Sequence, residues 1–296
     1  MGDGRLDARG WAAAAWPDDD WSRARVEHGA FHEVLVLPTG PVARLTDGRG
    51  HRERTQREAA VTSVVAGLDL GVPVPTPLSE PVTADGVTGV LVSRVAGEPR
   101  SASHWSDVRH GMVQLLDRLR AVHRDGATAA LPPVRSWCGG ASWPALVREQ
   151  LAPRLPPSAR STAARVVADV LEAEAEADAC LVHGDLGLHN VLWPDAGDDA
   201  GLTGLIDVDH AAWADPAVDV APLVGAFGVQ QLAADVEPDL LHRAMVHRAT
   251  LSLQVAAAAE LAGRTALRDH ALATVARRVA EGTLYEPHGL RPHRRP

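Results

Sequence analysis

The stretch His183-Gly184-Asp185-Leu186-Gly187-Leu188-His189-Asn190, followed further along by Leu205-Ile206-Asp207, carries most of the chemical information in this chain. It contains a carboxylate, an amide five residues later and a second carboxylate behind a short apolar run. Phosphoryl transfer uses this combination: an acid that orients a hydroxyl nucleophile, and an Asn and an Asp that hold Mg²⁺ on nucleotide phosphates. Asp185 is therefore the candidate catalytic base, and Asn190 and Asp207 are candidate ligands of Mg²⁺, which prefers oxygen donors.

Apolar runs on both sides of this stretch favour a catalytic loop over an ordinary turn. Asp and Asn in turn-rich loops usually cap local backbone groups, and the spacing alone leaves that alternative open. Cys180-Leu181-Val182 leads in, Val191-Leu192-Trp193 leads out, and residues 202–206 bring Asp207 to a strand end. Strands that frame a loop of this composition predict a kinase-type site.

Length and composition indicate an ordinary globular protein of 296 residues, either one large domain or two modest lobes. No run of eighteen apolar residues exists, and residues 1–20 lack a basic segment that leads into an apolar one, so we expect neither a membrane partner nor secretion. The two cysteines, Cys138 and Cys180, are too few for a disulfide framework. We therefore expect a cytoplasmic protein.

The charged residues narrow the choice of partner. All 29 basic residues are arginines, so any phosphate contact from a basic side chain has to come from Arg. The net charge is −9, which argues against nucleic acid as a partner because a phosphate backbone needs a basic face. An acidic site would instead attract a cationic small molecule.

The first hundred residues differ from the rest in the secondary structure that the sequence predicts. Short β-prone runs and one helical run fill the first part, and a Pro/Gly-rich turn at 38–41 predicts a hairpin. These expected elements are strands over 31–37, 42–45 and 87–95 and a helix over 52–65. The sequence pattern changes from strand-rich to helical near Gly97. This change predicts a small lobe over 1–94, a hinge over 95–98 and a large helical lobe over 99–296.

Helical periodicity dominates the second part. The apolar stripe between 106 and 123 is the clearest, with Ser106 as a plausible N-cap. Further expected helices cover 143–155 and 158–177, and a helical block covers 237–280. The tail over 282–296 is rich in Pro, His and Arg, and we expect it to be mobile.

The motif extends beyond the metal-binding pattern. Asp215-Pro216-Ala217 and Asp219 follow Asp207, and with them the chain resembles the aminoglycoside phosphotransferase family of antibiotic kinases over nearly its whole length after about residue 25. The resemblance implies an α+β, protein-kinase-like two-lobe fold with a small β-rich N-lobe and a large, mainly helical C-lobe. It also implies an enzyme that uses Mg²⁺ and ATP or GTP to phosphorylate an alcohol group.

Two further segments resemble the family members that act on the tuberactinomycin peptides viomycin and capreomycin. They are Gly29-Ala30-Phe31-His32, and Leu68-Asp69-Leu70-Gly71 running to Pro77-Leu78-Ser79-Glu80. The expected acceptor is therefore a cationic antibiotic of this kind, inactivated by phosphorylation of a hydroxyl. An aminoglycoside, a macrolide, or a small metabolite alcohol such as choline or homoserine remains the alternative.

The resemblance also assigns nucleotide-binding roles in the N-lobe. Arg44 stands where the family usually places its phosphate-binding Lys, and Glu58 in the following helix is the expected ion-pair partner, with Glu53 as a competitor. The backbone of Gly29 and Phe31 is expected to cover the phosphates, although this loop holds a single glycine. Ser93 and Val95 match the hinge, where backbone groups would read an adenine edge.

Four other residues complete the expected site. Asp209 and His189 are candidates for contact with the substrate. His183 is expected to orient the catalytic loop, and Asp219 to brace it from the helix that follows.

Two functions of other classes compete with a kinase. A nucleotide-binding pseudokinase that serves as an interaction module would have lost one of Asp185, Asn190 and Asp207, and all three are present. A hydrolase with Asp185 as nucleophile is disfavoured by the Asn ligand and by the lack of a second nearby base.

Overall fold

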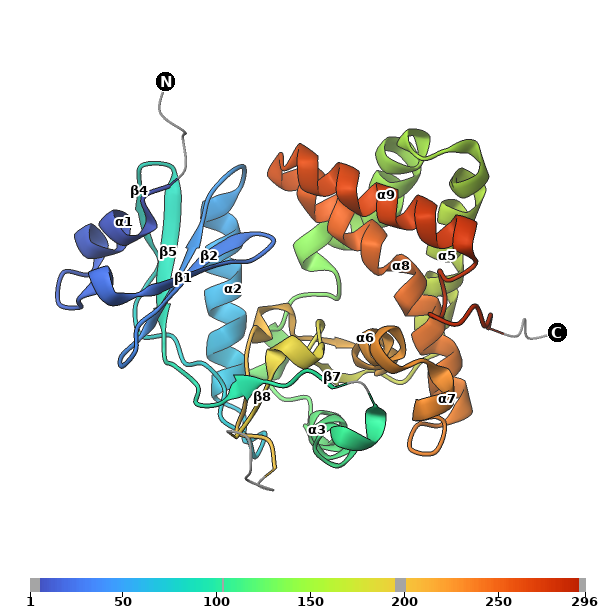
Figure 1. Ribbon diagram of the computed structural model, residues 1–296, viewed down its shortest axis with the longest axis horizontal. Helices are drawn as coiled ribbons and strands as arrows, with labels where there is room; N and C mark the ends of the chain where they lie inside the picture. Colours follow the sequence, from blue (N-terminus) through green and yellow to red (C-terminus); the bar gives the residue numbers. More distant parts are fainter. Residues whose placement is uncertain (1–5, 103, 195–200, 293–296) are drawn as a thin grey trace.

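The structure is a computed structural model and describes residues 6–102, 104–194 and 201–292. An antiparallel sheet forms the N-lobe on one side, and a mainly helical C-lobe lies on the other (Figure 1). The α+β two-lobe expectation is thereby confirmed. The limits of 1–94, 95–98 and 99–296 for lobes and hinge stay a prediction.

The N-lobe sheet has five strands in the order β1-β2-β3-β5-β4, all antiparallel. The predicted hairpin around 38–41 is confirmed, since the strands on either side of it pair from Val36↔Val42 to His32↔Thr46. The strands are β1 (Arg25–His28), β2 (His32–Val36), β3 (Val42–Thr46), β4 (Val82–Ala84) and β5 (Val87–Val92).

The two faces of this sheet have different neighbours. Alternate residues such as Ala43 and Leu45 are buried with Trp11 of α1 (Ala8–Ala15), a helix that the sequence did not predict. Arg44 between them therefore faces the other way, towards α2 (His51–Ala66) and the C-lobe. The alternation of the strand thus decides which side chains reach the junction of the lobes.

Helix α2 lies between the sheet and the C-lobe (Figure 1). Its predicted range, 52–65, is confirmed within one residue at each end. Val61 and Val65 of α2 belong to the same buried cluster as the first long C-lobe helix. The lobes therefore share a hydrophobic contact beside the site.

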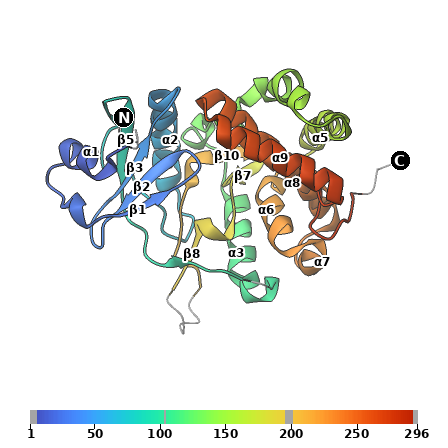
Figure 2. The ribbon, with the colours of Figure 1, turned by 45° about the horizontal axis from the view of Figure 1, so that its top comes forward.

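The C-lobe has helices in all four predicted blocks, with three corrections, and two more helices, over 217–227 and 229–232, for which no range was predicted. The C-lobe helices are α3 (Arg109–Ala121), α4 (Trp143–Leu146), α5 (Pro157–Ala175), α6 (Ala217–Phe227), α7 (Val229–Leu232), α8 (Pro238–Ala262) and α9 (Thr265–Glu281). Figure 2 shows α9 running across the C-lobe beside α8.

Each correction has a local cause. Ser106 is not the N-cap of α3, because a 3-10 turn over Trp105–Asp107 precedes that helix and is capped through His104 and Asp107. The segment over 143–155 passes from α4 into a π-helical turn and ends in a 3-10 turn at Pro153, whose ring removes a backbone donor. The block over 237–280 is two helices, since Gly263 at φ +74° ends α8 in a left-handed cap.

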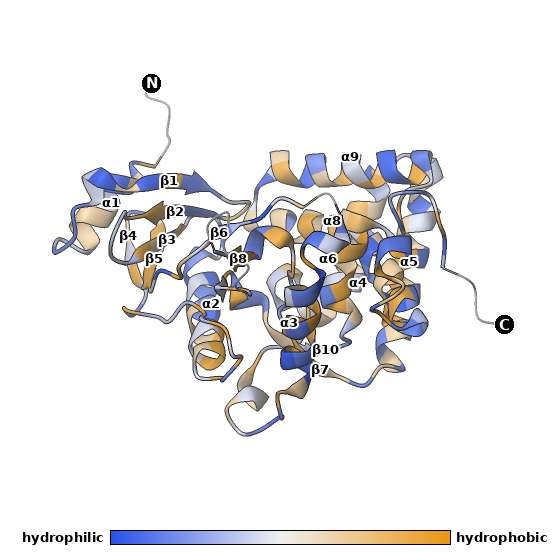
Figure 3. Cartoon of the chain, turned by 60° about the horizontal axis from the view of Figure 1, so that its bottom comes forward, coloured by the Kyte–Doolittle hydropathy of each residue, from blue (hydrophilic) through white to orange (hydrophobic). Residues whose placement is uncertain are grey.

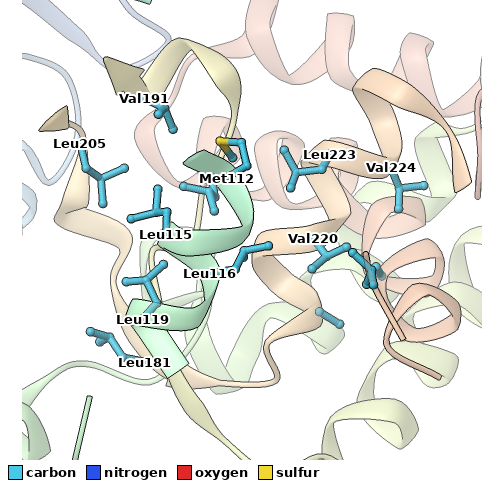
Figure 4. Packing of buried hydrophobic residues seen from close by; sticks show 14 of the residues in the cluster. Met112, Leu115, Leu116, Leu119, Leu181, Val191, Leu205, Val220, Leu223 and Val224 are labelled. Carbon is cyan, nitrogen blue, oxygen red and sulfur yellow. The ribbon is translucent and has the colours of Figure 1, made fainter. Parts of the chain in front are cut away.

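The main core of the C-lobe packs α3 against α6 and the short strands around the catalytic loop (Figure 4). Most of the predicted apolar stripe is buried, and each fully buried side chain of this kind contributes roughly 1.5–3 kcal/mol. Its buried residues are Val108, Met112, Leu115, Leu116 and Leu119, and Val122 is partly buried. This packed core therefore supports the loop that bears Asp185.

A second cluster of buried apolar residues packs α5, α8 and α9 together. Figure 3 shows hydrophilic and hydrophobic residues alternating along α9. The expectation of a mobile tail over 282–296 is wrong for residues 283–286, which pack against the C-lobe. Leu284 and Glu286 are buried, and Arg248 donates to the carbonyls of Thr283 and Leu284 at 2.7 Å. Within the described ranges, no helix is long and apolar enough to cross a membrane.

Candidate active site

Two small sheets frame the catalytic loop. Strand β7 (Cys180–Val182) pairs with β10 (Ala212–Ala214), and β8 (Val191–Trp193) pairs with β9 (Gly204–Leu205) and β6 (Glu98–Pro99). Because the loop over 183–190 joins β7 to β8, it is anchored at both ends. The segment that leads to Asp207 lies alongside, since Ile206 N donates to Asn190 O at 2.9 Å.

His183 and Asp219 hold the loop in shape. Asp219 accepts hydrogen bonds from the backbone N–H groups of His183 (2.7 Å) and Gly184 (2.9 Å). The buried His183 ring accepts from Asp185 N at 3.2 Å through Nδ1, and its Nε2 lies 2.8 Å from Ile206 O. Both ring nitrogens of His183 thus have hydrogen-bond partners in the loop region, and the ring orients the loop.

Asp185 itself is half-exposed, as a group that receives a substrate has to be. Its backbone carbonyl accepts from Asn190 Nδ2 at 2.8 Å, and its carboxylate lies 3.8 Å from His189 Nε2. Partial burial opposes ionisation, but the contact with His189 and the neighbouring His210 and His183 outweigh it and hold the pKa of Asp185 below 3.8. The carboxylate is therefore ionised at neutral pH and able to accept a hydroxyl proton.

The donor set at Asn190 and Asp207 fits Mg²⁺. Asn190 is buried and uses Nδ2 to hold the loop, which leaves its oxygen as the atom for a cation. Asp207 is half-exposed in a left-handed conformation (φ +55°), a region that Asp tolerates better than most residues, and one of its oxygens, Oδ1, contacts Arg44. An amide oxygen and a second carboxylate oxygen are hard ligands of the type Mg²⁺ takes.

Arg44 joins the two lobes, but not through the partner predicted for it. Its guanidinium lies 2.7 Å from Asp207 Oδ1 and 3.2 Å from Asp209 Oδ2. Glu58 instead contacts His32 Nε2 at 2.8 Å, and Glu53 is exposed. The prediction of an Arg44–Glu58 ion pair is therefore wrong, because two carboxylates face the forked guanidinium while Glu58 is held by a histidine.

Asp209 lies in this network and not at the surface. Burial disfavours its charge, but Arg44 outweighs that effect and holds the pKa of Asp209 well below its usual range. Asp209 is thus an ionised carboxylate that positions Arg44, and His189, with a 69% exposed side chain, is the better placed of the two to meet a substrate.

His32 was missed by the sequence analysis, although a signal was present. It stands two residues before Val34, the cross-strand partner of Arg44, so the strand alternation places both on one face. Together with Glu58 and Asp209 it forms a polar cluster from three elements and both lobes.

The loop over 29–31 is held by the C-lobe. Gly29 N donates to His32 O at 2.8 Å, so this N–H is already used and the expectation that it covers a phosphate needs correction. Arg264, between α8 and α9, donates to the carbonyls of Ala30 (3.0 Å) and Phe31 (3.3 Å) and pairs with Asp47. The Phe31 ring packs against the second C-lobe cluster and under the guanidinium of Arg54. Arg264 was also missed.

One of the two residues assigned to the hinge, Ser93, does not have the free backbone N–H expected of it. Ser93 N donates to Thr76 O at 2.8 Å and Ser93 Oγ accepts from Thr76 N, so the Ser93 N–H is not available to read an adenine edge. Val95 packs against Gly204 of β9, which leads to Asp207. A cavity of about 690 Å³ borders this segment; its lining includes Ser93, Arg94, residues 96–98 and the hairpin turn over 38–41.

The chain is similar to known phosphotransferases in sequence and in fold. The phosphotransferase enzyme family matches residues 22–252. Viomycin phosphotransferase of Streptomyces vinaceus is 31% identical over 227 residues, which cover 73% of this chain and 77% of that protein.

Two solved structures share the fold at lower identity. The GDP complex of wild-type aminoglycoside 2'-phosphotransferase-IIIa superposes with a TM-score of 0.73 at 18% identity, covering 95% of this chain and 100% of that one. Macrolide 2'-phosphotransferase type I gives a TM-score of 0.60 at 20% identity, covering 86% and 90%. The chain therefore belongs to the phosphotransferase enzyme family, and it is a phosphotransferase with the two-lobe, kinase-like fold.

Proposed function

We propose that this enzyme is a Mg²⁺-dependent nucleotide O-phosphotransferase that inactivates a cationic antibiotic, a tuberactinomycin peptide such as viomycin or capreomycin. The phosphoryl-transfer part of this proposal is supported by one observation. Two adjoining loops place Asp185, Asn190 and Asp207 close together, and Arg44 reaches Asp207 from the N-lobe. The 31% identity to viomycin phosphotransferase supports this acceptor over an aminoglycoside or a macrolide.

Each residue of the site has its own role in phosphoryl transfer. Asp185 accepts the proton of the acceptor hydroxyl as the hydroxyl oxygen attacks the γ-phosphorus; the bond from the γ-phosphorus to the β,γ-bridging oxygen breaks, and the nucleoside diphosphate leaves. Asn190 and Asp207 would hold Mg²⁺, which neutralises charge on the phosphates. Arg44 contacts Asp207 and Asp209 through its two terminal nitrogens, and its guanidinium has further N–H donors for a phosphate, which a Lys held by two carboxylates would lack. His183 and Asp219 keep the loop in position throughout.

A phosphate on such a drug changes its charge enough to matter. Phosphorylation adds a charge of about −1.5 to −2 at pH 7. A cationic drug that binds an anionic target such as RNA loses part of its electrostatic attraction for that target. One transferred group is therefore a sufficient means of inactivation.

The test is a phosphorylation screen with the purified protein, Mg²⁺, and ATP or GTP. Viomycin, capreomycin, an aminoglycoside, a macrolide, choline and homoserine are each incubated, and the product is identified by its mass gain of one phosphoryl group. We expect viomycin or capreomycin to be the best acceptor, and Asp185→Asn to abolish the gain. Exclusive turnover of choline or homoserine would contradict the antibiotic assignment.

A further inference from the structure

Trp137 lies beside the catalytic loop, on a segment that no motif singled out. It occupies the middle of a 3-10 turn, Ser136–Cys138, that precedes α4. Its ring stacks on the His210 ring with centroids 4.7 Å apart and planes inclined by 13°. His210 ends the short turn that carries Asp209, so the indole is tied directly to the segment after Asp207.

The stacked pair lies next to Asp185. The backbone of His210 presses against Gly184, the residue before Asp185, so closely that a Cβ at Gly184 would collide with the His210 carbonyl. The strand after His210 also pairs with the strand before the catalytic loop, Ala212 with Val182. Trp137 thus connects through His210 to Gly184, the residue before the base, and it is itself partly exposed.

The turn that bears Trp137 is held rigidly. Arg135 adopts a left-handed conformation (φ +61°) and donates both terminal nitrogens to Glu174 at 2.5 Å. The same guanidinium lies 4.9 Å from the centroid of the Trp143 ring. A side chain on so fixed a segment loses little conformational entropy when a ligand binds, which suits a binding platform.

Trp137 also differs from three other tryptophans of the C-lobe, because each of those has an arginine side chain over its ring. Trp143, Trp193 and Trp213 each carry an arginine of this chain over the ring, at 4.9, 4.8 and 5.7 Å. Throughout the described residues, no arginine of the chain lies over Trp137. The ring on which it stacks, His210, belongs to the residue that lies against Gly184, next to Asp185 with its half-exposed carboxylate. An aromatic ring close to a carboxylate favours a cation from outside the protein.

We propose that Trp137 is the acceptor platform and stacks a flat cationic group, a guanidinium or amidine, of the molecule whose hydroxyl is presented to Asp185. The proposal rests on the proposed function and adds the chemical class that the site selects. A planar cation matches the indole face over its whole area, whereas a tetrahedral ammonium touches it at one point. An acceptor with a flat cation near its reactive hydroxyl is therefore preferred over one with amines alone.

The experiment compares Trp137→Leu, Trp137→Phe and a matched control, Trp16→Leu, in steady-state kinetics with viomycin and saturating nucleotide. Trp16 is also half-buried but belongs to the N-terminal aromatic cluster with Trp11 and Trp21. We expect Trp137→Leu to raise the KM for viomycin roughly five- to thirty-fold, the range of one cation–π contact, with kcat and the nucleotide KM within about twofold. Trp137→Phe should recover most of the loss.

A second measurement tests the chemical class. Methylguanidinium and methylammonium are compared at equal ionic strength as competitors of viomycin, for the wild type and for Trp137→Leu. We expect methylguanidinium to compete at lower concentration in the wild type and this difference to vanish in the variant. Equal inhibition by the two cations in the wild type, or an equal rise in acceptor and nucleotide KM in Trp137→Leu, would overturn the platform. A wild type that phosphorylates no acceptor would instead overturn the proposed function.

Discussion

Arg44 Nη1 lies 2.7 Å from Asp207 Oδ1, so an ion pair links the third strand of the N-lobe to the segment after β9 in the C-lobe. The second terminal nitrogen of Arg44 contacts Asp209, and both carboxylates are thus held by one forked cation. A Lys ammonium has no second arm at a fixed angle and could not hold both in this geometry. The chain, which contains no Lys, therefore uses Arg44 as a bridge between the lobes.

This bridge predicts which pairs of mutations are coupled. Arg44→Ala and Asp209→Asn each remove one side of a buried contact, so the double mutant should lose less stability than the sum of the single mutants. We expect a coupling free energy of about 1–3 kcal/mol, measured by urea unfolding at pH 7. The matched cycle of Arg44→Ala with Glu58→Gln should be more nearly additive, because Glu58 contacts His32. A larger coupling with Glu58 would show that the ion pair differs in solution.

The variant Asp185→Asn tests separately whether Asp185 is the catalytic base. This variant keeps the shape of the side chain but removes the acceptor of the hydroxyl proton, so we expect turnover to fall by about two to four orders of magnitude. Nucleotide affinity, measured by calorimetry, should stay within about threefold. Asp117→Asn on the exposed face of α3 is the control and should keep normal turnover. An Asp185→Asn enzyme with turnover close to wild type would exclude this residue as the base.

Local patterns predicted the elements that carry the chemistry. The 3.6-residue stripe of α3 and the hairpin around 38–41 are properties of short windows, and both were confirmed. The candidate catalytic loop is also a feature of a short window, a carboxylate and an amide five residues apart between two apolar runs, and its catalytic role stays a prediction. Helix ends were less predictable, since Ser106 and a 3-10 turn compete for the same backbone donors.

Contacts between distant segments could not be predicted in this way. Arg264 binds the carbonyl of Phe31 across a separation of 233 residues, and no periodicity relates the two. The choice of Arg44 between Glu58 and the two aspartates depended on the relative placement of the lobes, which follows from packing and not from spacing. Only the position of His32 was deducible, from the alternation of β2 and β3.

The contact of Arg264 with the loop over 29–31 predicts a role in nucleotide binding. Arg264→Ala removes two hydrogen bonds to loop carbonyls and the ion pair with Asp47, so the loop should open more often. We expect faster hydrogen exchange over 29–32 and a nucleotide KM that rises roughly three- to ten-fold, the range of about one hydrogen bond. Arg268→Ala is the control, because Arg268 forms comparable ion pairs with Glu260 and Asp269 but does not contact the loop. Similar nucleotide KM values in the two variants would contradict the role of Arg264.

The last prediction concerns the buried charge network behind the site. Asp215 accepts from Arg243 Nε at 2.9 Å and lies 3.3 Å from His247 Nε2, and its carboxylate is fully buried. Burial raises the pKa of Asp215, but His247, Arg243 and the Ala217 N–H outweigh it and leave the pKa below 3.8. A carboxyl whose pKa is lower in the folded state stabilises the fold above the unfolded-state pKa, and this contribution is lost as pH falls through the folded-state pKa.

Asp215→Asn should therefore lower the free energy of unfolding by about 3–5 kcal/mol at pH 7, since it leaves Arg243 without its buried partner. The difference from wild type should stay constant down to about pH 4 and shrink below it, as the wild-type carboxylate becomes protonated. Urea unfolding at a series of pH values measures both effects, with Asp178→Asn at an exposed position before β7 as the control. A stability difference that is the same at pH 3 and pH 7 would mean that loss of shape, and not loss of charge, destabilises the variant.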